Sequence, residues 1–343
     1  MIDAQRGFAL SQGRFDGVDA ARGAALVAMA VYHLGWDLSF LGLVVTDVIA
    51  HPVWRALGRA TAASFLFLVG VGLVLGHGRG LRTRAFLRRL AIVAGAAALV
   101  TVATRFAFPN DWVYFGILHC IAVASVVALP FVRAPVPVTL AAAALAFAAP
   151  RALASPAFDG RALAWTGLAA EPTPTVDYVP LLPWLAAVLV GVAAARLALP
   201  RLGLSGFAAW QARGPVSRPL VWAGRRSLAV YLIHQPVLLA ILYPLALALG
   251  PNPAAQEAAF RRAYAANCAA AGAPAPSCAA AAACTIERLR QEGLWEDTLA
   301  DRLDPERRAR VNALSRGCYE TVRERAQPGV PVSPLRATRE RLS

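Results

Sequence analysis

The sequence predicts an all-α, polytopic integral membrane protein of about seven transmembrane helices with a small C-terminal helical extension. Of the 343 residues, 58% are hydrophobic and only 16% are charged, whereas soluble domains are about half apolar and about a quarter charged. Long apolar runs fill residues 20–250, and residues 251–343 are polar, alanine-rich and charged. We therefore expect a transmembrane domain at 1–250 and an extracytoplasmic, helical, cysteine-containing segment at 251–343.

Seven apolar runs approach the roughly 20 residues that a helix needs to cross the hydrocarbon core. The first run continues too far for a signal peptide, so we expect it to remain as a signal-anchor. The fifth is the least secure, because Pro150 is expected to end it. The expected spans are Ala20–Leu41, Thr61–Leu75, Phe86–Phe106, Val113–Val132, Val136–Ala152, Leu181–Leu199 and Ser227–Leu249.

The basic residues indicate membrane topology and not nucleic-acid binding. All 34 are arginines, the net charge is +14, and most arginines in the first 250 residues flank apolar runs, with no basic stripe of interleaved aromatics. With the N-terminus in the cytoplasm, the inner segments carry 14 arginines and the outer segments 5, as the positive-inside rule requires. We expect a multi-pass protein of the bacterial inner membrane with a cytoplasmic N-terminus and a periplasmic C-terminus.

Four of the five cysteines lie in the C-terminal segment. Their spacing has no close pair and no following histidine, so it does not match a zinc site, and we expect no metal. Two disulfides in an oxidising compartment are the favoured use, and the sequence leaves three pairings open. These cysteines are Cys268, Cys278, Cys284 and Cys318. Asp304 and Pro305 are expected to cap and begin a helix there, and Cys120 is expected to be a buried thiol within a span.

Several ionisable side chains lie within the expected spans, where such groups are costly. Arg22 and His33 are eleven residues apart on the first span, which places them on one face about 16 Å apart along the axis. Asp37 follows His33 by one turn. His119 and His234 lie in the middle or outer half of the fourth and seventh spans. We expect the three histidines to converge on one cavity; alternatively, each makes one interhelical hydrogen bond.

The outer segment before the sixth span contains Asp177, Tyr178 and, at the helix start, Trp184. Its prolines and aromatics indicate a rigid rim, and we expect these three residues to contact the substrate. A role as interfacial anchors is equally compatible with Tyr178 and Trp184. The remaining histidines, His51 and His77, are expected to be solvated loop residues.

Five short blocks of residues occur in an order that is typical of a known family. They cover residues 14 to about 245, some two thirds of the chain. The blocks are Arg14 to Gly23, Tyr32-His33 with Trp36-Asp37-Leu38, Phe115 to His119, Asp177-Tyr178 through Pro183-Trp184, and Gly224 with Ser227 through Pro236. Together they resemble the bacterial branch of the heparan-alpha-glucosaminide N-acetyltransferase family. The spacing of Arg22 and His33 is also similar to that of the wider membrane acyltransferase superfamily.

The resemblance implies an enzyme that passes an acetyl group from cytosolic acetyl-CoA, its co-substrate, to a sugar-type amine or hydroxyl across the membrane. Arg22, Arg88 and Arg89 would bind the CoA phosphates. His33 would act as base or nucleophile, oriented by Asp37 and assisted by the other two histidines. The expected partners are membrane lipid, acyl-CoA and a glycan or other small acceptor, and a homo-oligomer is compatible with the sequence.

The chain departs from the eukaryotic members of that family. Those members use a histidine in the loop after the first span and have an asparagine at the position of His33. Here the same loop offers only His51, at a different spacing. The eukaryotic luminal domain is absent, so the resemblance does not identify the acceptor.

Two other classes of function fit parts of the pattern. A proton-coupled transporter or flippase would also use an intramembrane cluster of histidine and aspartate, but no inverted repeat of broken helices is visible. A haem-binding electron carrier would need two histidines that face each other across helices, and a reduced-minus-oxidised spectrum of the purified protein would detect it.

Overall fold

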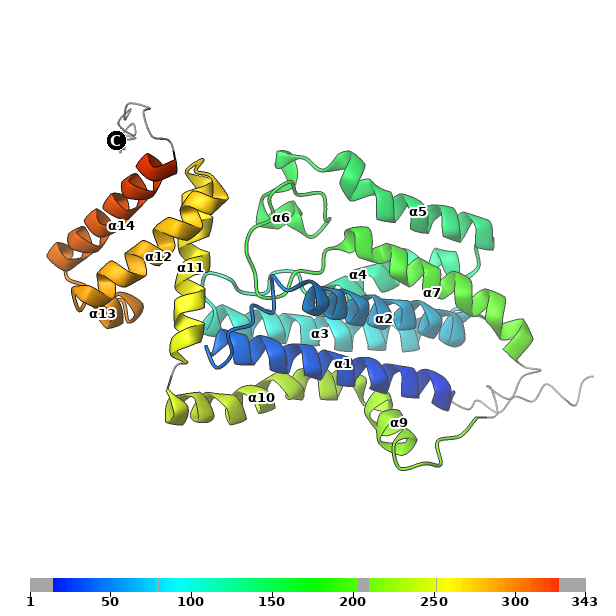
Figure 1. Ribbon diagram of the computed structural model, residues 1–343. Helices are drawn as coiled ribbons and strands as arrows, with labels where there is room; N and C mark the ends of the chain where they lie inside the picture. The colour runs from blue at the N-terminus through cyan, green and yellow to red at the C-terminus, as the bar shows by residue number, and fades with distance from the viewer. Residues whose placement is uncertain (1–14, 79, 203–209, 251, 327–343) are drawn as a thin grey trace, which may run out of the picture. The chain divides into compact units, whose positions relative to one another are not determined.

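The computed structural model describes residues 15–78, 80–202, 210–250 and 252–326. This part of the chain is 76% helical and contains 13 α-helices and no strand. The sequence-based prediction of an all-α polytopic membrane protein is confirmed (Figure 1).

Seven helices correspond to the seven apolar runs. Five of them, α2, α3, α5, α7 and α10, are long and apolar enough to cross a membrane. Helix α1 has 25 residues but carries Asp16, Asp19, Arg22 and Asp37. The bounds are α1 Asp16–Phe40, α2 Pro52–His77, α3 Thr83–Ala107, α4 Ile117–Ala128, α5 Val136–Leu153, α7 Leu181–Leu202 and α10 Ser227–Leu249.

Two expectations about these helices were wrong. The fourth run does not form one helix over Val113–Val132: α4 has 12 residues, and a separate 3-10 turn follows at Pro130–Val132. Gly116 is extended at its start, and Pro130 interrupts it at its end because proline has no N–H to continue the ladder. Conversely, Pro150 lies inside α5, which continues to Leu153, since neighbouring groups in membrane proteins compensate for the missing bond.

Helices α2 and α7 are in close backbone contact within the first unit. These helices pack together with α4 and α5 (Figure 1). A Cβ on Gly70 of α2 would overlap the carbonyl oxygen of Val188, and a Cβ on Gly191 of α7 would overlap that of Phe67. Small residues that let backbones approach are a main source of helix association in membranes. The fully buried side chains at this contact include Leu66, Val188, Leu189 and Val192.

Helix α9, Ser217–Arg225, packs in the same way against the start of α1. A Cβ on Gly224 would overlap the backbone of Asp19. Arg225 forms an ion pair with Asp16 (2.6 Å) and approaches Asp19 (3.5 Å), while Arg22 binds Asp19 (2.9 Å). This network fixes the Arg22 end of α1.

The chain divides into two compact units, residues 1–36 with 48–240 and residues 37–47 with 241–343. The predicted division at residue 250 into a transmembrane domain and an extracytoplasmic segment stays a prediction. In the structure, residues 37–47 join the C-terminal helices: the Asn252 N–H donates to the Gly42 carbonyl (3.2 Å), and Arg262 forms an ion pair with Asp47 (3.1 Å).

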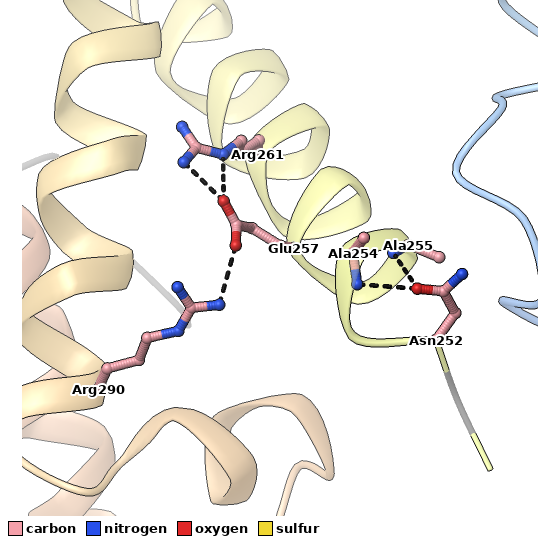
Figure 2. A network of polar contacts seen from close by, with 6 residues as sticks. All are labelled: Asn252, Ala254, Ala255, Glu257, Arg261 and Arg290. Carbon is pink, nitrogen blue, oxygen red and sulfur yellow. Dashed lines mark hydrogen bonds and ion pairs between the residues drawn. The ribbon is translucent and has the colours of Figure 1, made fainter.

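The second unit contains a small helical bundle: α11 Pro253–Ala270, α12 Ala275–Gln291, α13 Trp295–Leu299 and α14 Pro305–Ala326. Its core contains Ile286, Leu289, Leu294 and Trp295. As predicted, Asp304 caps α14 by accepting a hydrogen bond from the Arg307 N–H (2.8 Å). Figure 2 shows the equivalent cap at α11, where Asn252 accepts from Ala254 and Ala255, and a carboxylate, Glu257, that binds Arg261 and Arg290.

Two disulfides cross-link this bundle, and the structure selects one of the three pairings. Cys268 pairs with Cys278, which joins α11 to α12, and Cys284 pairs with Cys318, which joins α12 to α14. Cys120 is free and buried.

Two further short elements, a 3-10 turn at Pro156–Phe158 and α6 at Arg161–Ala164, lie before α7.

We predict that the Cys284–Cys318 bridge stabilises the bundle more than the Cys268–Cys278 bridge. The sequence separations are 34 and 10, and loop-closure entropy gives about 4 and about 3 kcal/mol, respectively. Hydrogen exchange of residues 252–326 in the full chain should therefore increase more in C284A/C318A than in C268A/C278A. Non-reducing mass spectrometry of the wild type should find all four thiols blocked; free thiols would contradict the pairing.

Candidate active site

Two of the intramembrane histidines meet directly. His33 on α1 and His234 on α10 are 201 residues apart in the chain, and His33 Nδ1 lies 2.8 Å from His234 Nε2. The ring centroids are 4.8 Å apart. Both rings are half-buried. The contact joins α1, which carries two of the five family-like sequence blocks, to α10, which carries most of the last one.

A third polar side chain completes this cluster. Gln235 Oε1 lies 2.8 Å from the same Nδ1 atom of His33. The ring Nδ1 of His234 faces the carbonyl oxygen of Tyr231, one turn earlier on α10. Sequence reasoning did not assign a role to Gln235, although it follows His234 directly. The sequence did contain a signal for Gln235, because it is a second polar residue beside His234 in the mainly apolar helix α10.

Aromatic and acidic groups surround the two histidines. The Tyr32 ring lies 5.7 Å from His33, and the Tyr231 ring lies 5.7 Å from His234. Both tyrosines interact electrostatically with the carboxylate of Asp177. The segment before α7 therefore contributes a negative group that acts on both tyrosines.

His119 has different partners. The Gly116 N–H donates to His119 Nδ1 (3.2 Å), so the hydrogen is on Nε2, which donates to Thr101 Oγ1 (3.2 Å). The Thr101 hydroxyl donates in turn to the Val113 carbonyl (2.8 Å). The Nδ1 atom thus caps the start of α4, and the Nε2 atom ties α4 to α3. Convergence of His119 with the other two histidines stays a prediction, as does its catalytic role.

Asp37 is fully buried and lies one turn beyond His33 on α1. It belongs to residues 37–47, which are grouped with the second unit. Its predicted action on His33 therefore rests on helical spacing alone and stays a prediction.

Asp177 caps α4 from a distant part of the chain. The Ile117 N–H donates to Asp177 Oδ2 (3.1 Å), and a Cβ on Gly116 would overlap that oxygen. Glycine at position 116 thus makes room for the carboxylate, which takes the place of an N-cap side chain. Burial raises the pKa of Asp177 to about 6, and the hydrogen bond from Ile117 opposes this shift.

Tyr178 and Trp184 pack within the protein. The Tyr178 hydroxyl donates to the Ala164 carbonyl (2.6 Å), and its ring lies 5.9 Å from Tyr114. Trp184 is partly buried against the first unit's core. Both side chains support the segment that carries Asp177, and their contact with substrate stays a prediction.

Two arginines converge at the opposite end of α1. A Cβ on Gly72 of α2 would lie 3.1 Å from Arg22 Nη2 and 3.5 Å from Arg89 Nη1. The two guanidinium groups are close enough to repel each other. Arg22 is paired with Asp19, whereas Arg89 forms no ion pair with a described residue. Arg88 and Arg89 are both exposed, but consecutive residues point about 100° apart around a helix, so Arg88 lies on another face of α3.

His77 lies near this arginine pair. It is buried at the end of α2, where the Arg82 N–H donates to its Nδ1 atom (3.3 Å) and the Phe86 ring packs edge-on. The expectation of a solvated loop histidine was therefore wrong, because α2 continues two residues beyond the predicted Leu75. A narrow cleft is lined by His77, Phe86, Arg89 and Ser125. Arg79, one of the arginines counted on the cytoplasmic side in the predicted topology, lies outside the described residues.

His51, in contrast, is exposed, as expected. Among the residues that the structure describes, no three His, Cys, Asp or Glu side chains are grouped in a way that could hold a metal ion.

Comparison with known proteins identifies the region that contains these groups. Residues 14–236, more than half of the chain, match the family model described as heparan-alpha-glucosaminide N-acetyltransferase, catalytic. No curated protein and no solved structure matches the chain. The matched range includes His33, His234, Asp177 and both convergent arginines.

We predict that Asp177 makes stability depend on pH. Its pKa is raised from 3.8 to about 6 in the folded state, so the folded protein binds the proton more tightly than the unfolded chain does. Stability from this group is therefore greatest below pH 3.8 and falls as the pH rises towards 6. Asp177→Asn should remove this component, measured as the difference in Tm between variant and wild type at pH 4 and pH 7. An identical difference at both pH values would contradict the assignment.

Proposed function

The chain belongs to the heparan-alpha-glucosaminide N-acetyltransferase family, and from this membership we propose that it transfers an acetyl group across the membrane. The donor is cytosolic acetyl-CoA, and the acceptor is a sugar-type amine or hydroxyl on the far side. The observation that carries the proposal is the direct contact of His33 with His234 within the family's catalytic region. It supplies a base inside the bundle at a position distant from the convergent arginines.

The convergent arginines are the proposed site for the CoA phosphates. Arg22 and Arg89 approach the same glycine, Gly72, whose missing side chain leaves space between them. Within the part of the chain that the structure describes, Asp19 is the one carboxylate that pairs with either guanidinium group, so the two groups have an excess of positive charge. A phosphate anion would relieve their repulsion and accept charge-assisted hydrogen bonds from both. Arg88, predicted from sequence to join them, points elsewhere and is proposed as an accessory cation at most.

The distance between the two sites suits the shape of the donor. Arg22 and His33 are about 16 Å apart along α1, and the extended pantetheine arm of CoA can bridge such a distance. The phosphates would stay at the arginine end, while the thioester would reach His33. One rigid helix would thus align both parts of the donor.

The acceptor site is proposed at the segment that carries Asp177. This carboxylate lies near Tyr32 and Tyr231 and interacts with them electrostatically. A carboxylate and two phenols suit an acceptor with amine or hydroxyl groups. Tyr178 and Trp184 would shape the same rim, with Asp37 and His119 as further candidates for the reaction centre.

The same proposal places the protein in the bacterial inner membrane with the arginine end towards the cytoplasm. The count of 14 inner and 5 outer arginines supports this orientation. The transporter alternative gains no support, because the matched family is one of acetyltransferases.

We predict that Arg89→Ala weakens CoA binding at least ten-fold, because it removes one of two charge-assisted contacts to phosphate. Arg88→Ala is the matched control, being the adjacent arginine on another face, and should change affinity less than two-fold. Isothermal titration of the detergent-solubilised chain with CoA gives both values. Equal effects of the two variants would contradict a site between Arg22 and Arg89.

We also predict that His33→Ala lowers acetyl transfer at least 100-fold, as loss of a general base does. Transfer is measured with radiolabelled acetyl-CoA and glucosamine as the acceptor probe, and the Tm of each variant shows whether the fold is retained. His51→Ala, which changes an exposed histidine, should leave the rate unchanged. Loss of acetyl transfer in His51→Ala, together with retained transfer in His33→Ala, would overturn the proposed reaction centre.

A further inference from the structure

We propose that His234 and Gln235 are positioning residues that hold His33 with its hydrogen on Nδ1, so that His33 reacts through Nε2. The catalytic part of this inference rests on the proposed acetyl transfer. The placement of hydrogens does not, because it follows from the contacts of three side chains.

His234 carries its ring hydrogen on Nδ1. Its Nδ1 atom faces the carbonyl oxygens of Tyr231 and Val230. A carbonyl oxygen can only accept a hydrogen bond, so the hydrogen of His234 must be on Nδ1. A neutral imidazole carries one N–H. His234 Nε2 therefore presents a lone pair.

The lone pair on His234 Nε2 determines where His33 carries its hydrogen. Its Nδ1 atom lies 2.8 Å from the lone pair of His234 Nε2. Two lone pairs at this distance would repel each other, so His33 carries its hydrogen on Nδ1. Gln235 Oε1, also 2.8 Å away, is a second acceptor for the same hydrogen. The reverse arrangement would require a charged His234, which is costly within a membrane.

Nε2 is the reacting atom of His33. With its hydrogen on Nδ1, His33 has a free lone pair on Nε2. That atom takes the proton of the acceptor's N–H or O–H while the acceptor heteroatom bonds to the acetyl carbonyl carbon. The C–S bond breaks, its electron pair leaves with the CoA sulfur, and the sulfur takes the proton from His33 Nε2. His33 is thereby restored.

The same contacts stabilise the charged intermediate form of the ring. When Nε2 is protonated, the Nδ1–H of His33 becomes a charge-assisted donor to two neutral acceptors, His234 Nε2 and Gln235 Oε1. This is the role that a carboxylate has in a Ser-His-Asp triad. A neutral pair orients the ring without adding a further charge at this depth.

The tautomer can be measured without activity. The chain has only five histidines, so nitrogen NMR of the full-length protein, labelled with ¹⁵N-histidine in nanodiscs, can be assigned with single variants. We expect His33 and His234 to show protonated Nδ1 and unprotonated Nε2. A wild-type His33 with its hydrogen on Nε2 would overturn the inference.

Matched variants test the positioning role. His234→Gln keeps an acceptor near the position of Nε2, whereas His234→Leu removes it. We expect His234→Leu to lower kcat at least ten-fold at unchanged KM for acetyl-CoA and to populate the other tautomer of His33, with His234→Gln restoring most of both. Gln235→Glu and Gln235→Leu form a second pair, in which we expect Gln235→Leu to lower kcat more than Gln235→Glu does. His51→Gln is the control and should leave kcat unchanged.

The outcomes separate this inference from the proposed function. If the tautomers are as expected and no variant or wild type transfers acetyl, the proposed function fails and the role in catalysis fails with it. If transfer occurs and neither His234→Leu nor Gln235→Leu changes kcat or the His33 tautomer, the positioning role alone is overturned.

Discussion

The contact of His33 with His234 is the interaction on which the arrangement of the first unit's functional groups depends. Polar side chains on apolar helices need partners, because water is scarce at that depth and an unpaired group is costly. The bond between the two rings fixes the rotation of α1 relative to α10. Tyr32 and Tyr231 lie beside the rings because each is a near neighbour of its histidine on the same helix. The rotation of α1 leaves Arg22, on the same face of α1, directed towards Arg89 and Gly72.

Glycines and buried charges hold the helices in this arrangement. Gly70 and Gly191 bring α2 and α7 into backbone contact, and Gly224 does the same for α9 and α1. At the arginine end, Asp16 and Asp19 bind Arg225 and Arg22. The acidic residues at the start of α1 therefore have a structural role, because they form ion pairs with these arginines. Arg89 forms no ion pair with a described residue, and its guanidinium group lies beside that of Arg22, so an anionic partner would offset their repulsion.

Much of the architecture could be predicted from sequence, because apolar runs and breakers act locally. Runs of about 20 residues predicted most of the long helices. The eleven-residue spacing between Arg22 and His33 predicted that both lie on the same face of α1. The break at Gly116 escaped prediction because it depends on Asp177, 60 residues away. The partners of His119 and His234 also escaped, since helix rotation depends on packing between segments. The disulfide pairing could not be predicted, because spacing alone leaves three possibilities.

An experimental structure of the full chain with bound CoA would test the central arrangement most directly. We expect density for the CoA phosphates between the guanidinium groups of Arg22 and Arg89, and the thiol end of the pantetheine arm near Nε2 of His33. We also expect His33 and His234 to remain in contact through Nδ1 and Nε2. Phosphates bound at another face of the bundle, or two histidines separated by more than a hydrogen-bond distance, would contradict both the donor site and the reaction centre.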